Sequence, residues 1–291
     1  PPQQNLIALI RSLTRNQPNC STCNSPLPEV IARFPHRSYY RCPDCGMTGM
    51  YRFDSNPDEY GVDYFTGEYR EQYGRTYMED YQAIKSMGQS RMNIIKRHKQ
   101  FGKLLDIGCA FGPFLHAAHE NGFDVHGIDI SQTAVEYVER ELGFKAGRGE
   151  FPSFNPITEF KVSRFDVVTL WYVIEHFRRL EPVLTRLADI LPPGGLLAFS
   201  TPNGAGVSAR RSLNDFLKNS PSDHYTIWTP RTAKKILSRY GFKVLQTRIT
   251  GHHPERILRG IRKDGFLYRM VMDLSRISSL GDTFEIYALK E

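Results

Sequence analysis

The feature that most constrains this chain is a regular alternation of apolar, strand-like runs with helical segments, which begins at Lys103. Short connections between such runs favour a parallel sheet covered by helices on both faces. We expect strands near 103–107, 124–129, 144–146, 165–170 and 195–200, and helices near 112–121, 131–142, 178–191 and 231–240. The predicted fold is therefore a doubly wound α/β sheet.

Two further runs with alternating polarity, at 242–249 and 283–290, bring the expected number of strands to seven. The residues between them, 251–281, form a long irregular-to-helical insert and not a crossover helix of the usual spacing. Parallel neighbours need such a crossover, whereas antiparallel neighbours do not. We therefore expect the last strand to run antiparallel to the others.

A glycine loop follows the first predicted strand directly, in the segment Lys103-Leu-Leu-Asp-Ile-Gly-Cys-Ala-Phe-Gly112. Gly108 and Gly112 allow a sharp turn and a close approach of backbone to ligand. Asp129, at the end of the next strand, can accept hydrogen bonds from both hydroxyls of an adenosine ribose. The dinucleotide fingerprint G-x-G-x-x-G is absent because Ala110 and Pro113 occupy its second and third glycine positions.

The pattern D-x-G-C-x-x-G at 106–112 resembles the first motif of class I S-adenosylmethionine methyltransferases. Residues 165–176 look like that family's fourth strand and its following loop, and 191–197 look like the turn into its fifth strand. The closing strand pair is similar to the family's antiparallel seventh strand. The resemblance spans roughly residues 76–291, and it implies a Rossmann-like fold with S-adenosylmethionine as cofactor.

The resemblance also implies which residues hold the cofactor. Those expected at its methionine end, with aromatic rings closing over it, are Asp106, Gly108, Cys109, Trp171 and Tyr172. Those expected at the helix start, the ribose and the adenine are Gly112, Asp129, Ile130, Gly149, Glu150 and Phe151. Core packing stays open as the alternative for Trp171 and for Cys109.

Two histidines are candidates for a general base, which is needed only if the acceptor must lose a proton. His176 follows Glu175 just past the fourth strand, and His224 lies in the loop before the sixth helix. As a base, either would have to be neutral, with a pKa near 6 to 7. Some quinol and catechol methyltransferases of the family bind a metal through an additional acidic residue three places before the Glu-His pair. Tyr172 stands there, which argues against a catalytic metal.

Four of the five cysteines form two pairs, Cys20-x2-Cys23 and Cys42-x2-Cys45, separated by eighteen residues. This spacing is typical of tetrahedral zinc sites with four thiolates, and such closed sites are structural. The expected organisation is a zinc ribbon with a leading helix at 1–50, a Tyr-rich linker and helix at 51–102, and a catalytic domain at 103–291 with inserts 203–229 and 251–281. We expect the ribbon to be a separate module. Positioning of the substrate entrance, docking of a partner and binding of nucleic acid remain open roles for it.

Positive charge is concentrated in the last third of the chain, where residues 207–291 hold 16 Lys and Arg against 8 Asp and Glu. Within the insert 251–281 apolar residues recur near helical spacing among arginines, which makes it amphipathic and basic. A substrate lid, a dimer contact, a membrane-surface helix and ordinary core packing are the alternatives.

These features predict a methyltransferase that acts on a small-molecule, glycan or lipid-linked acceptor at oxygen or carbon. The alternative is an RNA methyltransferase that uses the ribbon for recognition, although the ribbon is nearly neutral and the Asn-Pro-Pro-Tyr type signature is absent after the fourth strand. A third alternative is a binding module that senses the cofactor. With no export signal and an odd number of cysteines, the expected location is the cytoplasm.

Overall fold

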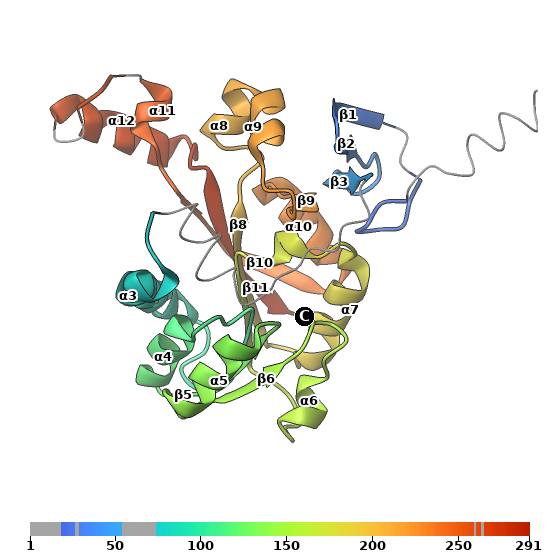
Figure 1. Cartoon of the computed structure of the whole chain (residues 1–291), viewed down its shortest axis with the longest axis vertical. Coiled ribbons are helices and arrows are strands. Elements are labelled where there is room, and N and C mark those ends of the chain that lie inside the picture. The colour runs from blue at the N-terminus through green and yellow to red at the C-terminus, as the bar shows by residue number, and fades with distance from the viewer. Residues whose placement is uncertain (1–18, 27–28, 54–73, 259, 263–264) are drawn as a thin grey trace, which may run out of the picture.

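The structure is a computed structural model that describes residues 19–26, 29–53, 74–258, 260–262 and 265–291. The expected leading helix before the first cysteine pair and most of the Tyr-rich linker lie outside these residues. Two sheets organise the described chain (Figure 1). None of its described helices is long and apolar enough to cross a membrane.

The larger sheet has seven strands in the order β10-β11-β8-β7-β4-β5-β6. The strands are β4 (Gly102–Ile107), β5 (Phe123–Asp129), β6 (Lys145–Arg148), β7 (Val167–Trp171), β8 (Leu196–Pro202), β10 (Phe242–Thr250) and β11 (Thr283–Lys290). The first five are parallel, and β11 is antiparallel to both of its neighbours, β8 and β10. The Rossmann-like fold with its antiparallel last strand is thus confirmed.

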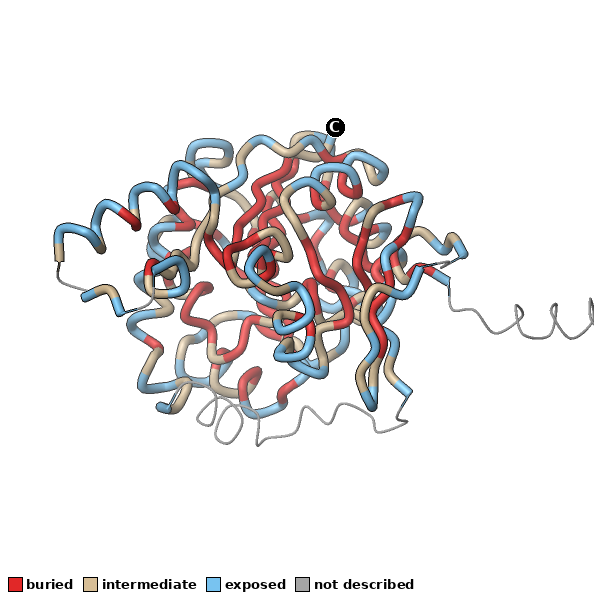
Figure 2. Tube along the Cα trace, turned by 90° about the horizontal axis from the view of Figure 1, so that it is seen from above, coloured by how far each residue is buried: buried red, intermediate tan, exposed pale blue. Residues whose placement is uncertain are grey.

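Helices cover both faces of this sheet because successive strand residues alternate between the faces. Leu104, for example, packs with one cluster of buried side chains and Leu105 with the other. The first cluster includes helices α3 (Tyr77–Ile95), α4 (Pro113–Glu120) and α5 (Gln132–Arg140), whereas the second includes α7 (Leu180–Ile190) and α10 (Pro230–Arg239). The strands between these layers are the most deeply buried part of the molecule (Figure 2).

The smaller sheet contains the three strands of the cysteine module and one strand from the first insert. Its order is β1 (Glu29–Phe34), β2 (Arg37–Arg41), β3 (Thr48–Arg52) and β9 (Thr226–Ile227), with every pair antiparallel. Cys20, Cys42 and Met47 belong to the same buried cluster as α7, α10 and the catalytic sheet. The ribbon therefore shares a buried cluster with the catalytic domain, because its own residues are too few to enclose a core.

Short helices lie beyond the carboxyl ends of the parallel strands. They are η2 (Ile174–His176) after β7, α8 (Val207–Arg211) and α9 (Leu213–Asn219) after β8, and α11 (Pro254–Ile257) and α12 (Phe266–Ile277) between β10 and β11. The remaining helix is α6 (Pro156–Glu159), after β6. Figure 1 shows the ribbon, the α8–α9 pair and the α11–α12 pair along one end of the molecule. This is the edge at which parallel sheets of this class bind ligands.

Candidate active site

The glycine loop turns sharply as it leaves β4. The backbone nitrogens of Gly108 and Cys109 donate to the carbonyl oxygen of Ile128 at 2.7 and 3.1 Å, which holds the loop against β5. Gly108, Ala110 and Gly112 all have positive φ, at 73°, 48° and 77°. A Cβ atom added to Gly108 would lie 2.4 Å from Cγ2 of Val173, so glycine is required here by space as well as by conformation.

Two buried carboxyl groups flank this loop. Asp129 accepts hydrogen bonds from the nitrogens of Ala110 at 2.8 Å and Ser131 at 2.9 Å, and burial raises its pKa. Asp106 accepts a hydrogen bond from Oγ1 of Thr169 at 2.6 Å, and burial raises its pKa to about 8. Carboxyl groups held this far from water favour a cationic partner, as well as hydroxyls that donate to them. The pair fits S-adenosylmethionine, which carries both a sulfonium and a ribose.

The residues expected around the adenine differ in exposure. Ile130 is 40% exposed beside Asp129, and Glu150 is exposed as well. The nitrogen of Gly149 donates to the carbonyl oxygen of Asp129 at 3.0 Å, which holds the loop after β6 beside the end of β5. Phe151, in contrast, is buried in the core with its ring 6.4 Å from that of Phe177. Its side chain supports this loop from below and does not present an edge to a ligand.

Two of the residues expected at the methionine end point into the core. The thiol of Cys109 fills the space above Gly127, where an added Cβ would lie 2.6 Å from the sulfur. The ring of Trp171 packs 5.0 Å from that of Phe114, with the guanidinium of Arg91 stacked 4.1 Å from its centroid. For these two side chains the core-packing alternative describes the contacts better than closure over a ligand. Tyr172 is 41% exposed, with φ of 59°.

The two candidate histidines are brought together by elements that are distant in sequence. Their rings are nearly perpendicular, with centroids 4.7 Å apart. Nδ1 of His176 lies 3.0 Å from a carboxylate oxygen of Asp223. Burial, followed by the charge of His176, lowers the pKa of His224 to about 3. The pKa of His224 thus lies below the range of 6 to 7 expected for a base, and the neutral imidazole is favoured.

Asp223 and Glu175 were given no role by sequence reasoning, although both stand next to a candidate histidine. Glu175 is 1% exposed, neither of its carboxylate oxygens has a hydrogen-bond partner within the described chain, and burial raises its pKa to about 7. One ligand atom each from Glu175, His176 and His224 lie within 4.8 Å of one another, close enough to share a divalent ion. In the sequence, the position of each acid next to a candidate histidine was the signal that could have identified it as a site residue. Burial of Glu175 depends on packing by distant segments and has no local signature.

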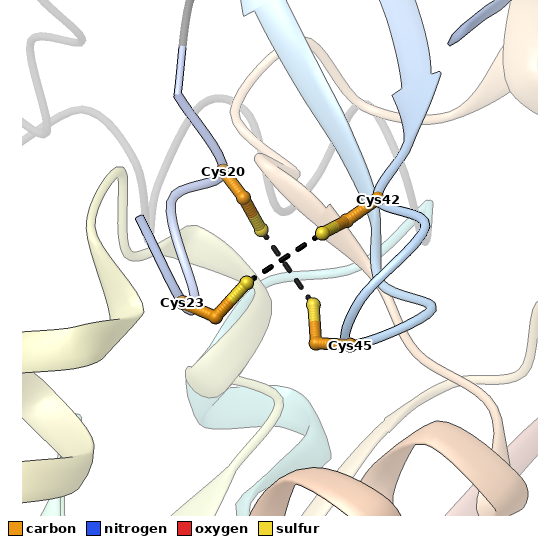
Figure 3. Close-up of side chains that lie close together, drawn as sticks. All are labelled: Cys20, Cys23, Cys42 and Cys45. Atoms are coloured by element: carbon orange, nitrogen blue, oxygen red, sulfur yellow. Dashed lines mark hydrogen bonds between the residues drawn. The ribbon is translucent and has the colours of Figure 1, made fainter. Parts of the chain in front are cut away.

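The four cysteines of the ribbon converge on one point (Figure 3). The sulfurs of Cys20 and Cys45 are 3.6 Å apart, and those of Cys23 and Cys42 are 3.5 Å apart. Metal–sulfur bonds of about 2.3 Å in a tetrahedron separate the sulfurs by about 3.8 Å, so the cluster has the size that a four-thiolate metal site needs. All four sulfurs lie within 4.8 Å of one another.

Comparison with known sequences places the chain in a family. A family model described as a methyltransferase domain matches residues 77–247, which is more than half of the chain. A ubiquinone biosynthesis O-methyltransferase from Idiomarina loihiensis is 26% identical over 159 residues, which are 52% of this chain and 62% of that protein. The enzyme of the same name from Methylococcus capsulatus is 30% identical over 141 residues, 46% of this chain and 56% of that protein. The match thus spans less than two thirds of these relatives.

Solved structures share the fold at low sequence identity. A SAM-dependent methyltransferase from Archaeoglobus fulgidus superposes with a TM-score of 0.54 and 18% identity, over 78% of this chain and all of that one. Magnesium protoporphyrin IX methyltransferase from Synechocystis, solved with bound SAH, superposes with a TM-score of 0.51 and 14% identity, over 79% of this chain and 97% of that one. Together with the family model and the glycine loop flanked by Asp106 and Asp129, these likenesses show that the chain belongs to the class I S-adenosylmethionine-dependent methyltransferases.

Proposed function

We propose that this protein methylates a hydroxyl group of a small-molecule acceptor with S-adenosylmethionine as the donor. The observation that carries the proposal is the cluster of His224, His176 and Glu175, whose side-chain nitrogen and oxygen atoms lie within 4.8 Å of one another beyond the carboxyl end of β7. The names of the sequence relatives, which are O-methyltransferases of ubiquinone biosynthesis, support oxygen as the methylated atom.

The residues divide into cofactor binding and proton transfer. Bound S-adenosylmethionine supplies a methyl group already activated by the sulfonium. Asp129 would accept hydrogen bonds from the ribose hydroxyls, and Ile130 would pack on the adenine. Ionised Asp106 would face the positive charge of the methionine end. Gly108, Gly112 and Gly149 let backbone approach the cofactor, with Glu150 at the adenine edge and Tyr172 beside the methionine. Placement of the acceptor in line with the methyl group is the main task of such a site.

His224 takes the proton of the acceptor hydroxyl in this proposal. Burial keeps His224 neutral before the acceptor binds, and a base is most effective when its pKa lies near the operating pH, so neighbouring negative charge must raise the proton affinity of His224 during the transfer. Glu175 belongs to this cluster, and Asp223 contacts His176 at 3.0 Å and orients it; the negative charge of both acids stabilises the imidazolium that forms. His176 is the second candidate for the base.

We further propose that the ribbon binds one structural Zn²⁺ through Cys20, Cys23, Cys42 and Cys45, and that its role is to hold the loop of His224. The nitrogen of Met50, in β3, donates to the carbonyl oxygen of Tyr225 at 2.8 Å, and the nitrogen of Tyr225 donates to that of Glu175 at 2.8 Å. Arg37 donates from the other end of the ribbon to the carbonyl oxygens of Lys218 at 2.8 Å and Pro221 at 3.2 Å.

These contacts favour the positioning role over the two other roles considered for the ribbon. Arg37 and, on α10, Lys235 and Arg239 all donate to backbone carbonyl oxygens across the ribbon boundary. Basic groups used in this way contribute to the attachment of the ribbon. Cytoplasmic residence stays a prediction from the cysteine content.

A direct test uses catechol as a hydroxyl acceptor and veratrole, in which both hydroxyls are already methylated, as its matched control. We expect formation of S-adenosylhomocysteine and O-methylated catechol with the first compound and neither with the second. Equal turnover of both compounds would contradict oxygen methylation. Salt-sensitive retention on RNA, accompanied by methylation of that RNA and none of catechol, would replace the proposal with the alternative.

A further inference from the structure

Only part of the apolar surface of helix α12 contacts the protein. Val271 is 4% exposed and Ser275 is fully buried, and Oγ of Ser275 lies 2.8 Å from Nδ1 of His252, which fixes the helix to the end of β10. Apolar side chains are also exposed elsewhere on the same helix, namely Phe266 at 83%, Leu267 at 47%, Met270 at 43%, Leu274 at 52% and Ile277 at 81%.

The exposed residues form a continuous stripe. At 100° per residue, Phe266, Met270, Leu274 and Ile277 fall within one quarter of the helix circumference, and Val271 and Ser275 are centred about 125° away from them. Ile257 and Leu258, at the end of α11, are 36% and 43% exposed and extend the apolar surface. Single exposed apolar residues are ordinary, but a stripe of this kind marks a surface that meets another apolar phase.

Positive charge borders the stripe. Arg269 and Arg276 lie along one edge of α12, and Arg276 also pairs with Asp273 at 3.2 Å. An open hollow of about 560 Å³ adjoins α11 and is lined by three apolar residues, Val207, Ile257 and Leu280, and by three arginines, Arg210, Arg211 and Arg256. The combination of an apolar floor with several guanidinium groups suits a phosphate that is attached to hydrocarbon.

Each of these arginines also has a partner within the protein. Arg256 pairs with Asp282 at 2.6 Å and donates to Ser208 at 3.0 Å, and Arg210 donates to the carbonyl oxygen of Ala205 at 2.8 Å. Arg211 makes a long contact, 3.5 Å, with the carbonyl oxygen of Arg256. A guanidinium has five N–H donors, so these contacts position the groups at the rim of the hollow and leave donor capacity for an anion.

We propose that the α11–α12 pair, together with Arg210 and Arg211 of α8, docks the enzyme on an anionic lipid surface. The stripe enters the region between headgroups and acyl chains, and the arginines contact lipid phosphates. Figure 1 shows α11 and α12 at the same end of the molecule as α8, α9 and the ribbon. If methyl transfer proceeds as proposed above, the acceptor is a lipid-linked molecule that reaches the site from this surface.

The test is cosedimentation with vesicles of phosphatidylcholine alone and with vesicles of phosphatidylcholine and phosphatidylglycerol in equal parts. We expect retention on the second kind only, reduced by added salt. The double variant Phe266→Ser/Ile277→Ser should bind at least about tenfold more weakly, because two large side chains no longer enter the membrane. The variant Arg269→Gln should lose about fivefold, since one basic residue near such a surface contributes on the order of 1 kcal/mol.

Matched controls lie on other parts of the surface. Phe101, 76% exposed just before β4, and Arg140, exposed on α5, are replaced as Phe101→Ser and Arg140→Gln and should leave vesicle binding unchanged. Equal binding to both kinds of vesicle, or wild-type binding by the stripe variants, would overturn the proposal. So would a lipid-free dimer that dissociates in the stripe variants, because the stripe would then be a contact between two copies. The readout is independent of methyl transfer, so failure of either proposal is distinguishable from failure of the other.

Discussion

The cysteine ribbon and the α11–α12 pair are both additions to the same catalytic sheet, yet they are attached in opposite ways. The ribbon shares a buried cluster with α7, α10 and the sheet, and it receives its fourth strand from the insert after β8. The α11–α12 pair is anchored through few buried side chains, such as Val271, and turns a stripe of large apolar residues outward. The ribbon is thus part of the core of the enzyme, whereas the α11–α12 pair exposes apolar side chains that the described residues do not cover.

Loss of the zinc site would have the largest effect if the ribbon is as integrated as its contacts indicate. We expect Cys42→Ser to release the metal and to lower the free energy of unfolding of the whole protein by on the order of 5 kcal/mol. Elemental analysis and thermal unfolding provide the measurements, with Met270→Ser as a matched change in the α11–α12 pair that should leave both unaltered. Independent melting of the catalytic domain at the wild-type temperature would show that the ribbon is a separate module after all.

The next effect concerns the loop that the ribbon holds. His224→Ala should lower kcat for methylation of catechol by about 10²- to 10⁴-fold with the affinity for S-adenosylmethionine preserved, because the proton acceptor is lost. His252, which contacts α12, serves as the control, and His252→Ala should retain turnover of this small acceptor. Near-normal rates in His224→Ala, in His176→Ala and in the double variant would leave positioning alone as the source of catalysis.

The third prediction concerns Asp106, on the catalytic sheet to which both additions are attached. Asp106 has a pKa of about 8, so it is mostly protonated at pH 7 in the free protein, and a bound sulfonium cation favours its ionised form. Affinity for S-adenosylmethionine should therefore rise as the pH increases towards 8, by up to about tenfold per pH unit, with release of a proton on binding.

Calorimetry in buffers of different ionisation enthalpy measures that proton. Asp106→Asn should abolish the part of the pH dependence that belongs to the protein and leave the part that belongs to the ligand's own amino group. An identical pH profile in the variant and the wild type would mean that Asp106 does not respond to the cofactor.

The smallest effect is expected at the outward stripe. Phe266→Ser should change the free energy of unfolding by no more than about 0.5 kcal/mol and leave turnover of catechol unaltered, because the side chain is 83% exposed. Val271→Ser, on the side of the same helix that packs against the protein, should cost about 2 kcal/mol or more, since it places a hydroxyl in a buried apolar position. Similar losses in both variants would show that the stripe is covered by the protein itself.

The sequence predicted the parts of this molecule whose signals are local. The strands and helices of the large sheet lie within a few residues of their expected positions because each has its own periodicity, and the cysteine spacing encodes the four-thiolate cluster directly. Strand β9 has two residues, Thr226 and Ile227, too few for any periodicity, and its place in the ribbon depends on β3. The low pKa of His224 and the inward orientation of Trp171 depend on packing between distant segments, which no single stretch of sequence records.

The ribbon is held by segments that are synthesised after it, as the hydrogen bonds between Ser21 and the start of α7 illustrate. The carbonyl oxygen of Ser21 accepts from the nitrogens of Leu180 at 2.8 Å and Glu181 at 3.2 Å, at a helix whose N-cap residue, Arg179, makes no side-chain hydrogen bond to it. During synthesis β3 appears long before β9, and at about 5 to 20 residues per second the delay is roughly 10 to 35 seconds. During that interval β3 has an unpaired strand edge, and zinc bound as proposed above would stabilise the cysteine module before β9 is made.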